Sequence, residues 1–277
     1  MSIKDILVQA DNSDAFESRL HYSIALAQSH HAHLTALYTV PRYAIPAYTG
    51  ISIDPAIFQT VIEGERQEAK KIQQKFETIT ANAELNVEWR LEEGDITHYL
   101  SLHGRYFDLV IVGQSNPDWG DDAFFGVADD LIIGLGRPGL VVPYVGAEPK
   151  APKRILVAWN ASRTATRAIN DALPLLKNAD FVEVMSINPE KNNASEGDIP
   201  AADISLHLAR HGVKATAKES HTKDLSKGDL ILSHAADIGA DLLVMGAYGH
   251  SRFRELVLGG VTRQLLKQMT LPVFMSH

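Results

Sequence analysis

The chain has 277 residues, of which 45% are hydrophobic and 22% are charged. These are ordinary values for a soluble globular protein, and they exclude a collagen-like, low-complexity or largely disordered chain. Because the chain contains no cysteine, thiol catalysis, cysteine-based zinc sites, iron–sulfur clusters and disulfides are also excluded. The length allows either two domains or one large domain.

The net charge of −8 is unevenly distributed along the chain. Residues 1–150 carry 11 Lys+Arg against 21 Asp+Glu, a net of −10, whereas residues 151–277 carry 15 against 13, a net of +2. We do not expect so acidic a chain, which lacks a basic stripe, to bind nucleic acid. If one half holds an anion such as a nucleotide, the charge favours the second half.

No apolar run approaches the roughly 18 to 20 residues that a membrane-spanning helix needs. The opening segment MSIKDILVQADNSD also lacks the apolar stretch of a signal peptide. We therefore expect a cytoplasmic protein that does not insert into a membrane.

An internal repeat organises the chain. Three segments of the first half recur in the second: ILVQADNS (6–13) as ILVAWNAS (155–162), DLVIVG (108–113) as DLLVMG (241–246), and FGVADDLI (125–132) as GGVTRQLL (259–266). GAEPKAPK, at 146–153, has the composition of a short linker. We therefore predict two tandem domains, at 1–147 and 152–277.

Strand-like and helix-like segments alternate in each half. The first half opens with an apolar strand, has a longer central segment at 41–85 with an amphipathic helix from about Pro55 to Thr80, and ends with strand-sized runs at 109–113 and 140–145. In the second half we predict strands at 155–159, 181–187, 213–219, 242–246 and 272–276, and helices at 162–177, 201–211, 227–238 and 254–268. This order predicts an α/β fold, in which each half is a five-stranded, mostly parallel, doubly wound sheet with helices on both faces.

Glycines gather after the strand at 242–246, in the segment GAYGHSRFRELVLGGVT. Doubly wound sheets bind ligands outside the carboxyl ends of their strands, which is where this segment is expected. Gly249, Gly259 and Gly260 leave backbone N–H groups free to approach a phosphate, the next helix N-terminus favours an anion, and Thr262 adds a hydroxyl. On spacing alone, tight turns and a helix cap explain the same glycines equally well.

The combined motif resembles the universal stress protein family. The resemblance rests on Gly-x2-Gly-x9-Gly-Gly-Val-Thr after DLLVMG, on the opening ILVAWNAS and on the closing Leu-Pro-Val-Phe. Because it extends over both halves, the chain looks like a tandem universal stress protein with an adenine nucleotide alpha hydrolase-like fold. The resemblance implies that ATP, with or without magnesium, binds in a crevice at the strand ends. It also implies that the two domains pack as an intrachain pseudo-dimer, and it leaves a further homodimer open.

The resemblance assigns a specific set of residues to the nucleotide. In chain order these are Ala158, Asn160, Ile187, Met245, Gly246, Tyr248, Gly249, Gly259, Gly260, Val261 and Thr262. The last five correspond to phosphate-binding positions, Met245, Gly246 and Tyr248 to the ribose and adenine side, and Ile187 to a backbone contact with adenine. Two positions depart from the family pattern: Asn160 stands where the family usually has Asp, and Gly260 where it usually has Ser or Thr.

The first half departs further from the motif. Its segment GQSNPDWGDDAFFGVAD keeps Gly113 and Gly126 but has Asn116, Phe125 and Ala128 at the places of Gly249, Gly259 and Thr262. Three carboxylates, Asp118, Asp121 and Asp122, would repel a triphosphate there, although Asp11 keeps the acidic residue of the family. We expect this half not to bind ATP, and to be a scaffold, a site for another ligand or an interface.

Histidines offer a weaker hypothesis. His207 and His211 stand four apart on a predicted helix, a spacing that can share a metal ion, but no third ligand is evident. The cluster of His30, His31 and His33 is explained by the favourable charge at a helix carboxyl end. We predict no metal site, and we interpret Trp159 as a packing residue rather than a platform for a base.

The motifs of several enzyme classes are missing from the sequence. There is no Gly-x4-Gly-Lys-[Ser/Thr] segment, no Gly-x-Ser-x-Gly segment and no evident general base or arginine finger. We therefore expect a stress-response binding or signalling module that binds ATP in its second domain and is not an enzyme, although slow hydrolysis is compatible with the sequence. The alternatives are a nucleotide-independent member that binds another small molecule or a protein, and a weak ATPase.

Overall fold

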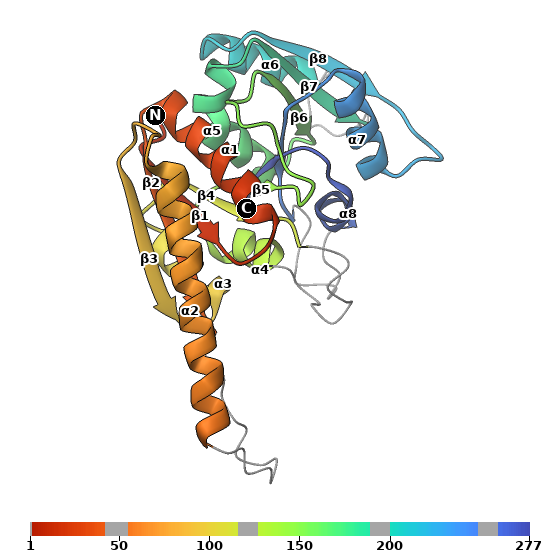
Figure 1. Cartoon of the computed structure of the whole chain (residues 1–277). Coiled ribbons are helices and arrows are strands. Elements are labelled where there is room, and N and C mark those ends of the chain that lie inside the picture. Colours follow the sequence, from red (N-terminus) through yellow and green to blue (C-terminus); the bar gives the residue numbers. More distant parts are fainter. Residues whose placement is uncertain (1, 42–54, 116–126, 189–199, 249–259) are drawn as a thin grey trace.

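A computed structural model describes residues 2–41, 55–115, 127–188, 200–248 and 260–277 (Figure 1). For residues 55–59, 129 and 200 it describes the backbone only. Several predicted features lie outside the described residues: Gly249, Gly259, the aspartates 118, 121 and 122, and the first residues of the helix expected from about 254.

The described part of the chain alternates strands and helices in the predicted order. The first half contains β1 (Asp5–Ala10), α1 (Ala15–His30), β2 (His33–Val40), α2 (Pro55–Thr80), β3 (Val87–Glu93), α3 (Ile96–Gly104), β4 (Leu109–Gly113), α4 (Val127–Gly134) and β5 (Gly139–Val142). The second contains β6 (Arg154–Trp159), α5 (Arg163–Lys177), β7 (Phe181–Ile187), α6 (Pro200–Arg210), β8 (Ala215–Ser220), α7 (Lys227–Asp237), β9 (Leu242–Gly246), α8 (Gly260–Gln268) and β10 (Val273–Ser276).

The strands form one continuous sheet with the order β3-β2-β1-β4-β5-β10-β9-β6-β7-β8. Within each half all neighbouring strands are parallel. The two halves meet where β5 and β10 pair antiparallel, with Val141 opposite Val273 and Leu140 opposite Phe274. The predicted α/β class, with a doubly wound parallel sheet in each half, is confirmed, and the pairing of the last strands makes the two sheets continuous.

Helices cover both faces of this sheet, which explains why its central strands are apolar throughout. The strand segments Leu109–Val112 and Leu242–Met245 are buried over their whole length, because side chains on both faces meet helices. One core cluster holds residues of α1, α2, α5 and α6, and a second holds residues of α3, α4, α7 and α8. The sheet edges differ: β3 and β8 carry Glu, Lys and Arg side chains and are mostly exposed.

The longest described helix, α2, packs on the sheet only through its carboxyl-terminal part, where Ala69, Ile72 and Phe76 are buried. Its amino-terminal part projects beyond the rest of the molecule (Figure 1). No helix in the described ranges is long and apolar enough to cross a membrane.

Polar contacts reinforce the junction of the halves. Gln114, directly after β4, is buried, and its side-chain nitrogen donates to the carbonyls of Leu266 (2.8 Å) and Lys267 (3.2 Å) in the last turn of α8. Its side-chain oxygen accepts from the Tyr144 N–H at 3.0 Å. A residue of the first half thus satisfies carbonyls that the end of a second-half helix leaves free.

Candidate functional site

A cavity of about 230 Å³ opens at the carboxyl ends of β6, β7 and β9. The described residues that line it are Ala158, Trp159, Asn160, Met185, Ile187, Lys227, Ile231, Met245, Gly246, Tyr248, Gly260, Val261 and Thr262. Nine residues assigned to the nucleotide from the sequence are among them, and the other two, Gly249 and Gly259, lie outside the described residues. The structure therefore brings together in one cavity every assigned residue that it describes.

Strand register builds the floor of the cavity. Ala158 of β6 lies opposite Met185 of β7 on one side and Met245 of β9 on the other. Met185 and Met245 belong to the core cluster on the α7 and α8 face, and Ala158 packs against that cluster. Because side chains alternate along a strand, Ile187 lies on the same face as Met185. The floor is apolar. Because Ala158 has only a methyl side chain, it leaves room for a ligand above the middle strand, β6.

The first turns of α7 and α8 form the opposite wall. Lys227 and Ile231 of α7 line the cavity, as do Gly260, Val261 and Thr262 at the start of α8. Gln264 of α8 ties the two helices together, since its side chain lies 2.9 Å from the Ser226 hydroxyl and 2.8 Å from Asp229. Two helix N-termini, each the positive end of a helix dipole, therefore converge on one hollow.

Thr262 has a defined position inside this wall. Its side chain is buried, and its hydroxyl oxygen accepts from the Tyr248 N–H at 3.4 Å. A hydroxyl that accepts still has its own proton to donate. Thr262 therefore holds the chain after β9 and keeps a donor for a ligand.

Asn160 keeps the local structure that an acidic residue makes in the first half. The Asn160 side-chain oxygen accepts from the Ser162 N–H at 3.2 Å, and Ser162 caps α5 by accepting from Ala165 N–H. In the first half Asp11 accepts in the same way from Ser13 N–H at 3.0 Å. The turn needs an oxygen acceptor and not a charge, so Asn160 removes the charge and keeps the turn.

Strained backbone conformations surround the cavity. Three non-glycine residues with positive φ follow the carboxyl ends of second-half strands: Ala161 (54°), Asn188 (47°) and Tyr248 (53°). Such conformations cost non-glycine residues free energy and persist where the surrounding structure fixes them. Asn188 is fixed by paired hydrogen bonds of 2.9 Å between its side chain and the backbone of Thr222.

Gly246 is required by packing. A Cβ at this position would collide with the backbone of Thr164 and Ala165, at the start of α5. Gly260 is different, because a Cβ there meets no atom of the described residues within 4 Å. Gly246 thus lets α5 approach β9, whereas no described residue crowds Gly260.

An internal ion pair lies beside the end of β4 in the first half, on the side where α1 packs. Arg19 of α1 is buried, and its guanidinium donates to Asp11 at 2.6 Å and to the Gln9 carbonyl at 3.0 Å. Gly113 at the end of β4 makes room for it, because a Cβ there would collide with the guanidinium. Burial lowers the pKa of Arg19, and Asp11 opposes that shift. The charge that Asp11 keeps is therefore already engaged by a side chain of the protein.

Residues that sequence reasoning did not assign also line the cavity: Trp159, Met185, Lys227 and Ile231. Met185 is two residues from the assigned Ile187, so strand alternation alone could have found it. Lys227 and Ile231 carry no local signal, because they reach the site through packing of α7 against α8. Trp159 packs against the core on the α5 face as expected, and it also contributes to the cavity.

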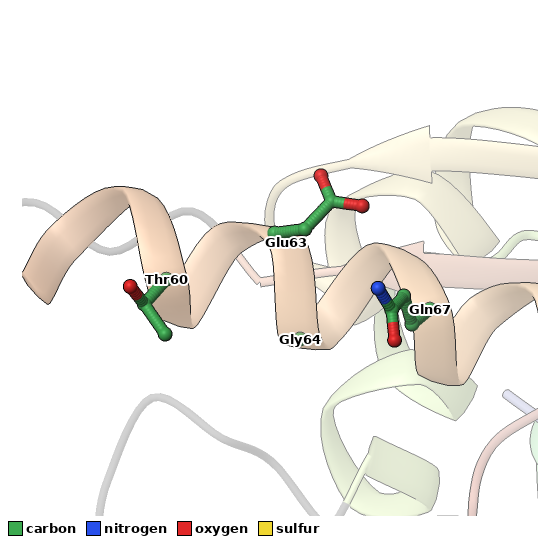
Figure 2. Close-up of a pocket in the computed structure, with 4 residues that line it drawn as sticks. All are labelled: Thr60, Glu63, Gly64 and Gln67. Atoms are coloured by element: carbon green, nitrogen blue, oxygen red, sulfur yellow. The ribbon is translucent and has the colours of Figure 1, made fainter. Parts of the chain in front are cut away.

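Other hollows are less suited to a ligand. One of about 460 Å³ lies against the projecting part of α2 and is lined by Thr60, Glu63, Gly64 and Gln67 (Figure 2). These four residues are exposed and come from a single helix, with Glu63 pointing away from the other three.

Histidines contribute no metal-binding group within the described ranges, where no three His, Cys, Asp or Glu side chains are grouped to hold a metal ion. The rings of His207 and His211 lie 4.7 Å apart. For His30 the helix-end explanation needs correcting: its side chain is buried, and burial lowers its pKa, which favours the neutral form.

Comparison with known proteins decides the family. Residues 152–277, which contain the whole cavity, match the model of the universal stress protein family. The second half of the chain is therefore a domain of the universal stress protein family. A universal stress protein of Synechocystis sp. is 23% identical to the chain, over 98% of this chain and 99% of its own length.

Solved structures agree with this fold along the whole chain. The crystal structure of a universal stress protein from Archaeoglobus fulgidus has a TM-score of 0.79 at 15% identity, covering 99% of this chain and 96% of its own. A functionally unknown protein from Pseudomonas aeruginosa PAO1 has a TM-score of 0.62 at 15% identity, covering 99% and 92%. At such low identity these similarities show the fold alone, and they extend it to both halves of the chain.

Proposed function

We propose that this universal stress protein binds an adenine nucleotide, with ATP as the leading candidate, in the cavity of its second half. One observation carries the proposal: all nine described residues that sequence motifs assign to a nucleotide line a single cavity at the strand ends. Residues that lie as far apart as Ala158 and Thr262 in the sequence would not converge in this way if they only formed local turns.

The composition of the cavity suits the parts of a nucleotide. Met185, Ile187 and Ile231 offer an apolar surface for a base. The first turn of α8 offers backbone N–H groups, the hydroxyl of Thr262 and the positive end of a helix dipole for phosphate. A mostly apolar pocket with a few convergent polar groups is the usual form of a small-molecule site.

The first half has a different role in this proposal. Asp11, the counterpart of the cavity residue Asn160, is already paired with Arg19, so we propose that this half binds no ATP and acts as a scaffold. Antiparallel pairing of β5 with β10 supports an intrachain pseudo-dimer of domains 1–147 and 152–277. A further homodimer and a cytoplasmic location stay predictions from the sequence.

We propose binding or signalling and not turnover as the activity. No histidine, aspartate or glutamate is among the described residues that line the cavity, so these residues offer neither an imidazole nor a carboxylate to activate a water molecule. Slow hydrolysis of bound ATP, a weak ATPase activity, would need a group from elsewhere. The nucleotide-independent alternative takes the same cavity for another small molecule.

A matched pair of substitutions tests the proposal. Val261→Trp places a large ring in the cavity, whereas Val127→Trp makes the same change at the repeat-equivalent position of α4 in the first half. Both valines are partly buried and lie in the first turn of their helix. Calorimetric titration of the full chain with ATP, ADP and AMP should show saturable binding that Val261→Trp abolishes and Val127→Trp leaves within about threefold. Absence of binding to all three nucleotides by the unmodified protein would reject the proposal and favour another ligand.

A further inference from the structure

The charge of the cavity is unusual for a site that holds a triphosphate with magnesium. Among the described residues that line it, Lys227 is charged and the rest are neutral. In proteins Mg²⁺ is bound through one or two carboxylates in addition to the phosphates of a nucleotide. The described wall offers no carboxylate for this purpose.

The oxygen donors that are present do not replace a carboxylate. The side-chain oxygen of Asn160 accepts from the Ser162 N–H, and the hydroxyl oxygen of Thr262 accepts from the Tyr248 N–H, so each is a neutral oxygen with one acceptor site already used. The nearest acidic residue of α7, Asp229, is engaged by Ser226 and by Gln264 and does not line the cavity. The described wall therefore offers a divalent cation neutral oxygens and no carboxylate, a poor set of ligands for Mg²⁺.

Lys227 occupies a position at which a positive charge lowers the stability of the helix. It is the first residue of α7, where a positive charge meets the positive end of the helix dipole. Its side chain is exposed and forms no ion pair within the part of the chain that the structure describes. A cation at such a site is unfavourable for the empty protein and favourable when a polyanion occupies the cavity.

We propose that the second-half cavity binds its nucleotide as the metal-free polyanion, with Lys227 supplying the countercharge that a divalent cation would otherwise supply. This inference rests on the proposed nucleotide site and specifies the ionic form of its ligand. Lys227 is then a binding residue that sets the preference for free over metal-complexed nucleotide.

The repeat provides a variant that reverses this preference. Asn160→Asp restores a carboxylate to the wall, and Asp11 shows in the first half that an aspartate makes the same turn with Ser13. The variant should fold normally. Its new charge should weaken the binding of free ATP and make added magnesium favourable, because the cation can bridge the carboxylate and the phosphates.

The test is titration of the full chain with ATP, once in EDTA and once in excess magnesium chloride. We expect the affinity in EDTA to equal or exceed that in magnesium. Lys227→Gln should weaken ATP binding in EDTA by about tenfold, the effect of one charge-assisted contact. Lys227→Arg should retain most of the affinity. Lys223→Gln removes the same charge from an exposed residue outside the cavity wall and should change affinity less than twofold.

A second readout separates binding from a structural role. Without nucleotide, Lys227→Gln should have an equal or slightly higher Tm than the unmodified protein, because it removes a charge from the wrong end of a helix dipole. The inference is overturned if magnesium raises the affinity tenfold or more, or if Lys227→Gln binds ATP as the unmodified chain does. If either result is obtained while Val261→Trp still abolishes ATP binding, the nucleotide site itself remains supported. Absence of ATP binding in both buffers overturns the site and the inference together.

Discussion

At the scale of single residues, comparison of the two halves distinguishes the hydrogen bond that shapes the turn after the first strand from the charge that could act on a ligand. Asp11 and Asn160 accept the same kind of backbone hydrogen bond two residues on, yet only Asp11 carries a charge, and Arg19 neutralises it. The sequence was sufficient to mark both positions and to note the lost charge at Asn160. It did not predict the Arg19 pair, because Arg19 reaches Asp11 and Gly113 only after α1 has packed on the sheet.

Gly260 allows a gain of affinity to be predicted. No described residue lies within 4 Å of a Cβ at Gly260, so we expect Gly260→Ser to add a hydroxyl donor at the start of α8. One added hydrogen bond contributes about 0.5–1.5 kcal/mol, so the affinity for ATP should rise about three- to tenfold. Gly260→Ala, which adds a methyl group but no donor, should leave it unchanged. Equal effects of Ser and Ala in calorimetric titration would contradict a phosphate-binding role for this turn.

The strain at Ala161 predicts an opposite pair of stability changes. Its φ of 54° costs an L-residue about 1–2 kcal/mol, and glycine avoids that cost while losing roughly 0.5–1 kcal/mol of chain entropy. Ala161→Gly should therefore stabilise the protein by up to about 1.5 kcal/mol. Ala236→Gly, at an exposed position within α7, should destabilise it by about 1 kcal/mol. The two Tm values should move in opposite directions, and a similar fall in both would show that Ala161 is unstrained.

At the scale of elements, periodicity and the repeat were enough to predict the order and most bounds of strands and helices. The long amphipathic pattern from Pro55 to Thr80 is α2 with the same limits. The strand predicted from 213 begins instead at Ala215, because Gly212 adopts positive φ and the Val213 N–H closes the end of α6 on the Leu208 carbonyl. The first residues of the predicted strand therefore belong to the turn that ends α6.

Gln114 should be essential to the position of α8. Gln114→Leu leaves the Leu266 and Lys267 carbonyls and the Tyr144 N–H without their buried partner. Loss of these bonds should lower the free energy of unfolding by about 1–3 kcal/mol. The surface substitution Gln74→Leu on α2 should change it by less than about 0.5 kcal/mol. Both free energies can be measured by urea unfolding. A change for Gln114→Leu as small as that for Gln74→Leu would mean that this contact between the halves contributes nothing to the free energy of unfolding.

At the scale of the whole molecule, the ten-stranded sheet joins the halves into one structure. The apolar last strands are visible in the sequence as runs at 140–145 and 272–276, but their antiparallel register depends on the complete fold and is not encoded locally. A continuous sheet with Gln114 across the junction predicts one calorimetric unfolding transition, whose van't Hoff and calorimetric enthalpies agree. ATP at 100 times its Kd should stabilise that single transition by about 2.7 kcal/mol. Two transitions, of which ATP shifts one, would show that the halves unfold independently.

The number of nucleotides bound per chain tests the central claim most directly. Equilibrium dialysis of the full chain against saturating radiolabelled ATP gives that number without assuming a mechanism. A cavity lined at the second-half strand ends, together with a first half in which Arg19 already engages Asp11, predicts a value close to one. Val261→Trp should reduce it to zero, and Val127→Trp should leave it at one. A value near two would contradict the role assigned to the first half, and a value of zero for the unmodified chain would contradict the nucleotide site itself.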